Sequence, residues 1–146
     1  MRGRASLRAT SLAAAILVIA AGCVAATPRV TQSVDLLNRL VEARTYITEQ
    51  APAADEGCTV VGDVETRLYG EPGLADVRAW SDLRDAADAL QAACGQQIML
   101  AQPAQDASQA LTRARTRWQQ GIQRELALAC DHLRQAATAL GRPTPC

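Results

Sequence analysis

Hydrophobic residues recur at steps of three and four along residues 104–140. This spacing matches the 3.6-residue period of an α-helix and places one apolar stripe along it. Arg and Gln fill most of the other faces, and the stripe continues in phase past Gly121. One continuous long helix is therefore predicted, although glycine lowers helix propensity by about 1 kcal/mol. The stripe contains Leu111, Ala114, Trp118, Ile122, Leu126, Ala129, Leu133, Ala137 and Leu140.

An earlier helix is predicted after residue 30, with Thr31 or Ser33 as its N-cap. It ends before Pro52, because a residue that precedes proline disfavours the helical region. Its apolar face is expected to contain Val34, Leu37, Leu40, Val41 and Ile47.

The middle of the chain has weaker signals. Residues 53–59 are expected to form a loop, and residues 60–69 favour a short helix over a brief strand. A turn follows at residues 71–73. The helical period then returns over residues 74–94, where Gly95 suits the end of a helix. A continuation of this helix through residue 100 is the alternative.

The last two long helices are predicted to form an antiparallel hairpin with its turn between Gly95 and Pro103. At that register Trp80 faces Trp118. The charged residues agree with the same register, since Asp82 then lies near Arg117 and Asp85 near Arg113. Residues 33–146 are therefore predicted to form one all-α domain, a bundle of three to four helices with a long C-terminal helix.

The N-terminal residues have the pattern of a secretory signal peptide. Three Arg and no acidic residue precede Ser11, and residues 12–21 are apolar. An apolar segment of this length is too short to span a bilayer permanently. Residues 1–22 are therefore predicted to be a signal peptide, and the product is expected to be exported.

Residues 19–23, Ile-Ala-Ala-Gly-Cys, resemble the lipobox of bacterial lipoproteins, although Ala20 stands where Leu is commonest. The resemblance implies that the Cys23 thiol is acylated, that Cys23 becomes the N-terminus, and that residues 23–32 are a spacer. It also implies an envelope location, in which Val24, rather than Asp, favours the outer membrane of a two-membrane bacterium. The alternative is cleavage after Val24, Ala25 and Ala26, before Thr27, which gives a secreted protein.

The four cysteines other than Cys23 form an even set, which in an exported chain predicts two disulfides. Cys94 lies too far from Cys130 along the predicted hairpin to be joined to it, and its distance from Cys146 is nearly as unfavourable. The remaining pairing is Cys58 with Cys94 and Cys130 with Cys146. These bonds matter because the core is poor in large side chains: the chain is 49% hydrophobic but only 3% aromatic, with no Phe.

The charge balance argues against a nucleic-acid partner. All fifteen basic residues are Arg, and fifteen residues are acidic. Removal of the three Arg in the leader leaves twelve Arg against fifteen acids, a net charge of −3. The Arg on the long helix, Arg113, Arg115, Arg117 and Arg124, are interpreted as structural rather than as a phosphate site.

The remaining polar residues lack the spacing of a catalytic or metal site. His132 is adjacent to Asp131 and two residues from Cys130, and such neighbours point apart on a helix. Asp82, Asp85 and Asp88 are interpreted as a solvent-exposed face that pairs with a neighbouring helix. The sequence therefore predicts no catalytic residue, metal or cofactor.

The chain is similar to the secreted chorismate mutases, which are also exported, all-helical, disulfide-bonded domains of comparable size. That similarity implies inward-facing Arg that hold a dicarboxylate, for which Arg39, Arg44 and Arg124 or Arg134 are the candidates. The favoured expectation is different: a lipoprotein held to the membrane through Cys23, which acts as a non-catalytic interaction or accessory module for an unidentified envelope protein.

Overall fold

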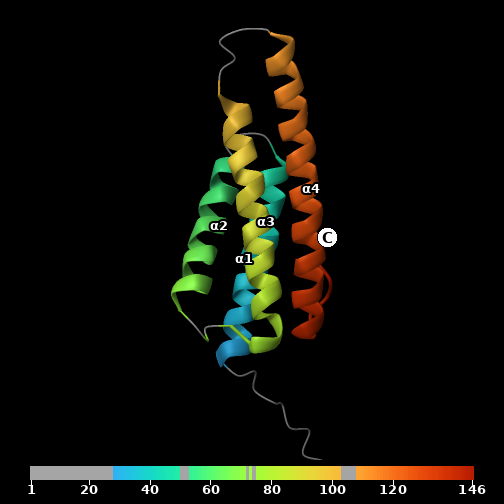
Figure 1. Ribbon diagram of the computed structural model, residues 1–146. Coiled ribbons are helices and arrows are strands. Elements are labelled where there is room, and N and C mark those ends of the chain that lie inside the picture. The colour runs from blue at the N-terminus through green and yellow to red at the C-terminus, as the bar shows by residue number, and fades with distance from the viewer. Residues whose placement is uncertain (1–27, 50–52, 72, 74, 103–107) are drawn as a thin grey trace, which may run out of the picture.

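The computed structural model describes residues 28–49, 53–71, 73, 75–102 and 108–146. These residues form four helices and no strand, which confirms the predicted all-α bundle (Figure 1). The helices are α1 (Pro28–Thr48), α2 (Ala53–Gly70), α3 (Val77–Ala101) and α4 (Gln109–Ala139). The long C-terminal helix α4 has 31 residues and continues through Gly121, as predicted.

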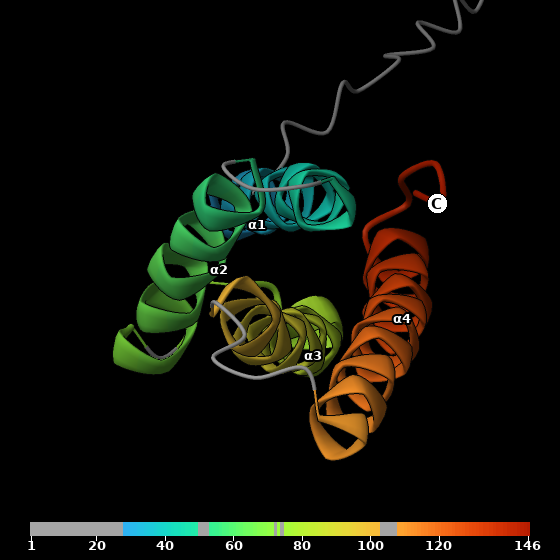
Figure 2. The same ribbon diagram turned by 90° about the horizontal axis from the view of Figure 1, so that it is seen from above.

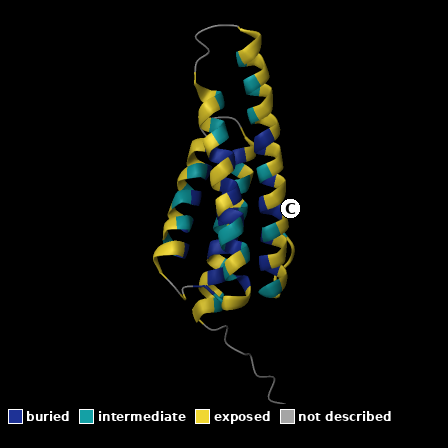
Figure 3. Cartoon of the chain, viewed as in Figure 1, coloured by how far each residue is buried: buried dark blue, intermediate teal, exposed yellow. Residues whose placement is uncertain are grey.

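α3 contacts each of the other three helices, and α2 and α4 flank it on different sides (Figure 2). The buried residues lie along the faces that these helices turn toward one another (Figure 3). Many of them are alanines, which let helices approach closely but bury little area each. The fully buried residues of α3 include Ala79, Leu83, Ala86, Ala87, Leu90 and Ala93.

Ser33 is the buried polar residue that joins α1 to the start of α3. Its hydroxyl donates to Arg29 O at 2.8 Å and accepts from Asp76 N at 2.7 Å. Asp76 in turn caps α3, because its carboxylate accepts from Arg78 N at 2.9 Å. Hydrogen bonds from Arg78 hold the pKa of the Asp76 carboxyl below its usual value. Ser33, predicted as an N-cap, is thus a core contact.

The first helix begins earlier than predicted. α1 starts at Pro28, inside the stretch 23–32 that the sequence predicts as a spacer. Proline fits the first turn of a helix, because its missing N–H would have no intrahelical partner there. Leu36 and Ala43 are fully buried on this helix, whereas Val34 and Val41 are only partly buried.

The predicted loop at residues 53–59 is wrong, because α2 already begins at Ala53. Two acidic residues in its first turn, Asp55 and Glu56, are favourable at the positive end of a helix. Ala54 and Gly57 are buried in the bundle. These tertiary contacts favour a helix here, although the polar sequence of residues 53–59 did not indicate one.

α3 does not end at Gly95 but continues to Ala101, which confirms the longer alternative. Gln97 Nε2 donates to Ile47 O at 3.1 Å, and Leu100 packs against the core. These contacts outweigh the local cost of a glycine, about 1 kcal/mol. α4 begins at Gln109, and Ser108 caps it by accepting from Leu111 N at 3.2 Å.

The extension of α3 changes the register of the hairpin. His132 Nδ1 lies 3.5 Å from the Asp82 carboxylate, and Gln96 lies against Gly121. At this register Trp80 lies level with the C-terminal turns of α4, so its predicted pairing with Trp118 is wrong. The predicted ion pairs of Asp82 with Arg117 and of Asp85 with Arg113 belong to the wrong register as well.

Both predicted disulfides are confirmed. Cys58–Cys94 joins α2 to α3 with a Cα–Cα distance of 5.7 Å, and Cys130–Cys146 joins α4 to the tail at 6.2 Å. The corrected register places Cys94 roughly 10–15 Å along the axis from Cys130. This separation is shorter than the one expected from the predicted hairpin, but it still exceeds the Cα–Cα distance that a disulfide can span, about 7 Å.

Two glycines of α2 give a matched test of how closely α1 and α2 pack. A Cβ at Gly57 would lie 2.7 Å from Ala43 O and 2.9 Å from Tyr46 Cβ, whereas a Cβ at Gly62 meets no atom within 4 Å. Gly57→Ala is expected to lower the free energy of unfolding by about 1–3 kcal/mol through overpacking. Gly62→Ala is expected to raise it by about 0.5–1 kcal/mol through helix propensity. Urea denaturation measures both, and equal effects would contradict the packing described.

Candidate functional site

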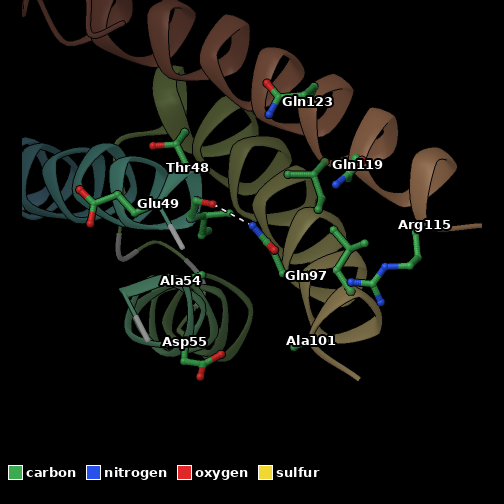
Figure 4. A pocket seen from close by; sticks show the side chains of 12 residues that line it. Thr48, Glu49, Ala54, Asp55, Gln97, Ala101, Arg115, Gln119 and Gln123 are labelled. Carbon is green, nitrogen blue, oxygen red and sulfur yellow. Dashed lines mark hydrogen bonds between the residues drawn. The ribbon is translucent and has the colours of Figure 1, made fainter. Parts of the chain in front are cut away.

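A polar cleft opens at the end of the bundle where α1 ends and α2 begins (Figure 4). It has a volume of about 690 Å³ and is bordered by all four helices. Its lining consists of Ile47, Thr48, Glu49, Ala54, Asp55, Gln97, Leu100, Ala101, Arg115, Gln119, Ile122 and Gln123.

The cleft combines a partly apolar wall with amide and charged groups. Ile47, Leu100 and Ile122 supply the larger apolar side chains, and Ile47 and Ile122 are buried. Gln97 is fixed by its hydrogen bond to Ile47 O, which the dashed line in Figure 4 marks. The charged groups of the lining are Glu49, Asp55 and Arg115, and its amides belong to Gln97, Gln119 and Gln123.

The structure does not bring together the Arg proposed for a chorismate-mutase-like site. Arg39 Nη2 lies 3.5 Å from Asp63, on α2. Arg44 Nε donates to Leu126 O at 3.0 Å and so links α1 to α4. Arg134 donates to Asp131 at 3.2 Å and to Cys146 O at 2.7 Å, both near it on α4 and the tail. Arg124 is exposed.

His132 and the acidic residues of α3 also take part in separate contacts. His132 pairs with Asp82, whereas its neighbour Asp131 pairs with Arg134. Asp88 accepts from the Tyr69 hydroxyl at 2.9 Å, and this bond, followed by burial, raises the pKa of Tyr69. In the described residues, no group of three or more His, Cys, Asp or Glu could hold a metal ion.

Sequence reasoning missed an aromatic cluster between α2 and α3. The Arg84 guanidinium carbon lies 4.7 Å from the centre of the Trp80 ring and 5.3 Å from that of Tyr69. Such cation–π contacts stabilise by about 0.5–2 kcal/mol. The spacing of Trp80 and Arg84 on one helix face was visible in the sequence, but the approach of Tyr69 from another helix was not.

Cys23, the predicted lipidation site, lies outside the described residues, as does the whole predicted signal peptide. The described chain begins with Pro28 at the end of the bundle opposite the cleft (Figure 1). Among the helices that the structure describes, none has the length and hydrophobicity needed to cross a membrane. In comparisons with known proteins, no family model, curated protein or solved structure matches the chain.

Substitution of Arg44 tests whether this side chain joins two helices. Arg44→Met keeps much of the apolar stem but removes the bond to Leu126 O, so the free energy of unfolding should fall by about 1 kcal/mol. Arg124→Met, an exposed change on α4, should stay within about 0.5 kcal/mol of the parent protein. Both are measured by urea denaturation, and an unchanged stability of Arg44→Met would show that the contact contributes nothing.

Proposed function

We propose that this protein is an exported bacterial lipoprotein, anchored through acyl chains on Cys23, that acts as a non-catalytic interaction module of the cell envelope. The observation that carries the proposal is the arrangement of the cysteines. Two disulfides use Cys58, Cys94, Cys130 and Cys146, which suits an oxidising compartment outside the cytoplasm. Cys23, the residue at the end of the lipobox-like motif, remains outside these pairs.

The short connection between Cys23 and α1 supports an anchoring role. Four residues separate Cys23 from Pro28, where α1 begins. Each buried CH₂ of an acyl chain contributes about 0.8 kcal/mol to membrane binding, and more than one chain gives a stable anchor. The bundle would then stand with the start of α1 near the bilayer and with the cleft at its far end.

An interaction role fits the described surface better than catalysis does. The Arg proposed for a chorismate-mutase-like enzyme contact three different parts of the chain. We therefore propose an envelope protein as the partner. In a two-membrane bacterium, Val24 after the cysteine favours the outer membrane, and cleavage before Thr27 would instead give a secreted form.

Intact-mass measurement of the mature protein tests the anchor. The expected product begins at Cys23, carries an acyl mass increment and enters the detergent phase on Triton X-114 partition. Cys23→Ala is expected to lose the increment and move to the aqueous phase. The double variant Cys130→Ser with Cys146→Ser is the control, since it removes cysteines but not the anchor. A mature N-terminus at Thr27 without acyl chains would exclude the lipoprotein.

A further inference from the structure

The first turns of α4 extend beyond the ends of α1 and α2, and α3 runs beside only their lower part, as far as Ala101. Gln97 bonds to Ile47 O in the last turn of α1, and the neighbouring Gln96 lies against Gly121 of α4. From Gly121, α4 continues for twelve residues to Gln109, a length of about 18 Å. Figure 1 shows this segment rising past the ends of α1 and α2. We call residues 109–120 the overhang of α4.

The apolar stripe of α4 continues along the overhang, but its residues are less buried there than lower on the helix. Ile122 and Leu126 are 4% and 2% exposed. Leu111, Ala114 and Trp118 share their phase on the helix yet are only partly buried (Figure 3). An amphipathic helix of this kind normally buries such a face against another element. The overhang therefore presents an apolar face without a complete partner in the described chain.

The overhang is also the basic end of an otherwise acidic chain. Residues 28–88 contain twelve acids and six Arg, whereas residues 89–124 contain four Arg and one acid, Asp106, outside the described residues. None of the four guanidinium groups forms an ion pair with another described residue. A surface of this charge attracts acidic partners and opposes basic ones. Three of the four, Arg113, Arg115 and Arg117, lie on the overhang, and Arg124 lies one turn below it.

We propose that the overhang binds an acidic amphipathic helix of a partner protein. The partner helix lies on Leu111, Ala114 and Trp118, along the line on which α1 would continue beyond Thr48. This inference rests on the proposed interaction role and names the chemistry of its partner.

A helix fits this position because another helix already covers α4 lower down. α1 packs against α4 there, as the bond from Arg44 to Leu126 O shows, and it stops at Thr48. The exposed stripe has the three- and four-residue spacing that receives a helix in a groove. The cleft lies at the foot of the overhang, where Arg115 and Gln119 form part of its wall.

A second copy of this chain is a poorer occupant. Two copies anchored through Cys23 on one bilayer stand side by side at the same height. Their overhangs would then bring Arg to Arg, which opposes association. The acidic helices α1 and α2 of the second copy would stand lower, beside one another rather than on the overhang.

The test selects helical peptides against the full mature chain in detergent. The displayed library contains peptides of about 15 residues, or four turns, with a fixed apolar stripe and with Glu or Lys in equal proportion at the flanking positions. Selected peptides should carry Glu at the flanks. Binding is then measured through the emission of Trp118 in the Trp80→Phe variant, in which Trp118 is the remaining Trp. A shift to shorter wavelength is expected as the peptide covers the ring.

Charge reversal identifies the surface that binds. Arg115→Glu with Arg117→Glu should weaken binding of the Glu peptide by about tenfold or more and favour the matched Lys peptide, because like charges across an interface oppose binding. Arg142→Glu, at the other end of the bundle, should leave the affinity unchanged. Circular dichroism checks that each variant is folded.

Several results would overturn the proposal. These are selection without Glu enrichment, binding that survives reversal of Arg115 and Arg117, or unchanged Trp118 emission on binding. Sedimentation that shows self-association through the overhang, or phosphatidylglycerol vesicles that displace the selected peptide, would assign the surface to another occupant. Peptide binding by a protein without acyl chains would refute the anchor alone, whereas an acylated protein that binds no peptide would refute this inference alone.

Discussion

Close packing of small side chains around α3 is the constraint on which the bundle depends. α3 touches every other helix and does so largely through alanines, with Ala79, Ala86, Ala87 and Ala93 fully buried. Gly57 serves the same purpose between α1 and α2. Such contacts need short interhelical distances but remove little apolar area from water. The Cys58–Cys94 bond therefore supplements a modest core by holding α2 against α3.

The sequence predicted the features that depend on the spacing of hydrophobic residues and on the even number of cysteines. The stripe along α4 predicted one long helix, and the even set of cysteines together with helix geometry predicted both disulfides. Boundaries were less predictable, because Gly95 and the polar residues 53–59 carry local signals that tertiary contacts override. The hairpin register failed for the same reason, since it was built on a turn that α3 passes through.

The candidate site could not be predicted in full, because it depends on contacts between residues that are far apart in the sequence. The lipobox-like motif ending at Cys23 is local and can be read directly. The cleft is assembled from four helices, and no local pattern places Glu49 and Arg115 in the lining of the same cleft. The position of Arg84 over Tyr69 and the role of Ser33 likewise depend on pairs that only the folded chain brings together. The basic character of the overhang was visible as a run of Arg, but its missing cover was not.

The placement of the disulfides gives the two connections on either side of α3 different tolerance to proteolysis. The bond between Cys58 and Cys94 encloses the connection from α2 to α3, so a protease that cuts once between Glu71 and Asp76 leaves both fragments covalently joined. Neither bond spans the connection from α3 to α4. A single cut between Gln102 and Ser108 would make α4 with its tail a separate polypeptide, held to the remainder by noncovalent contacts alone.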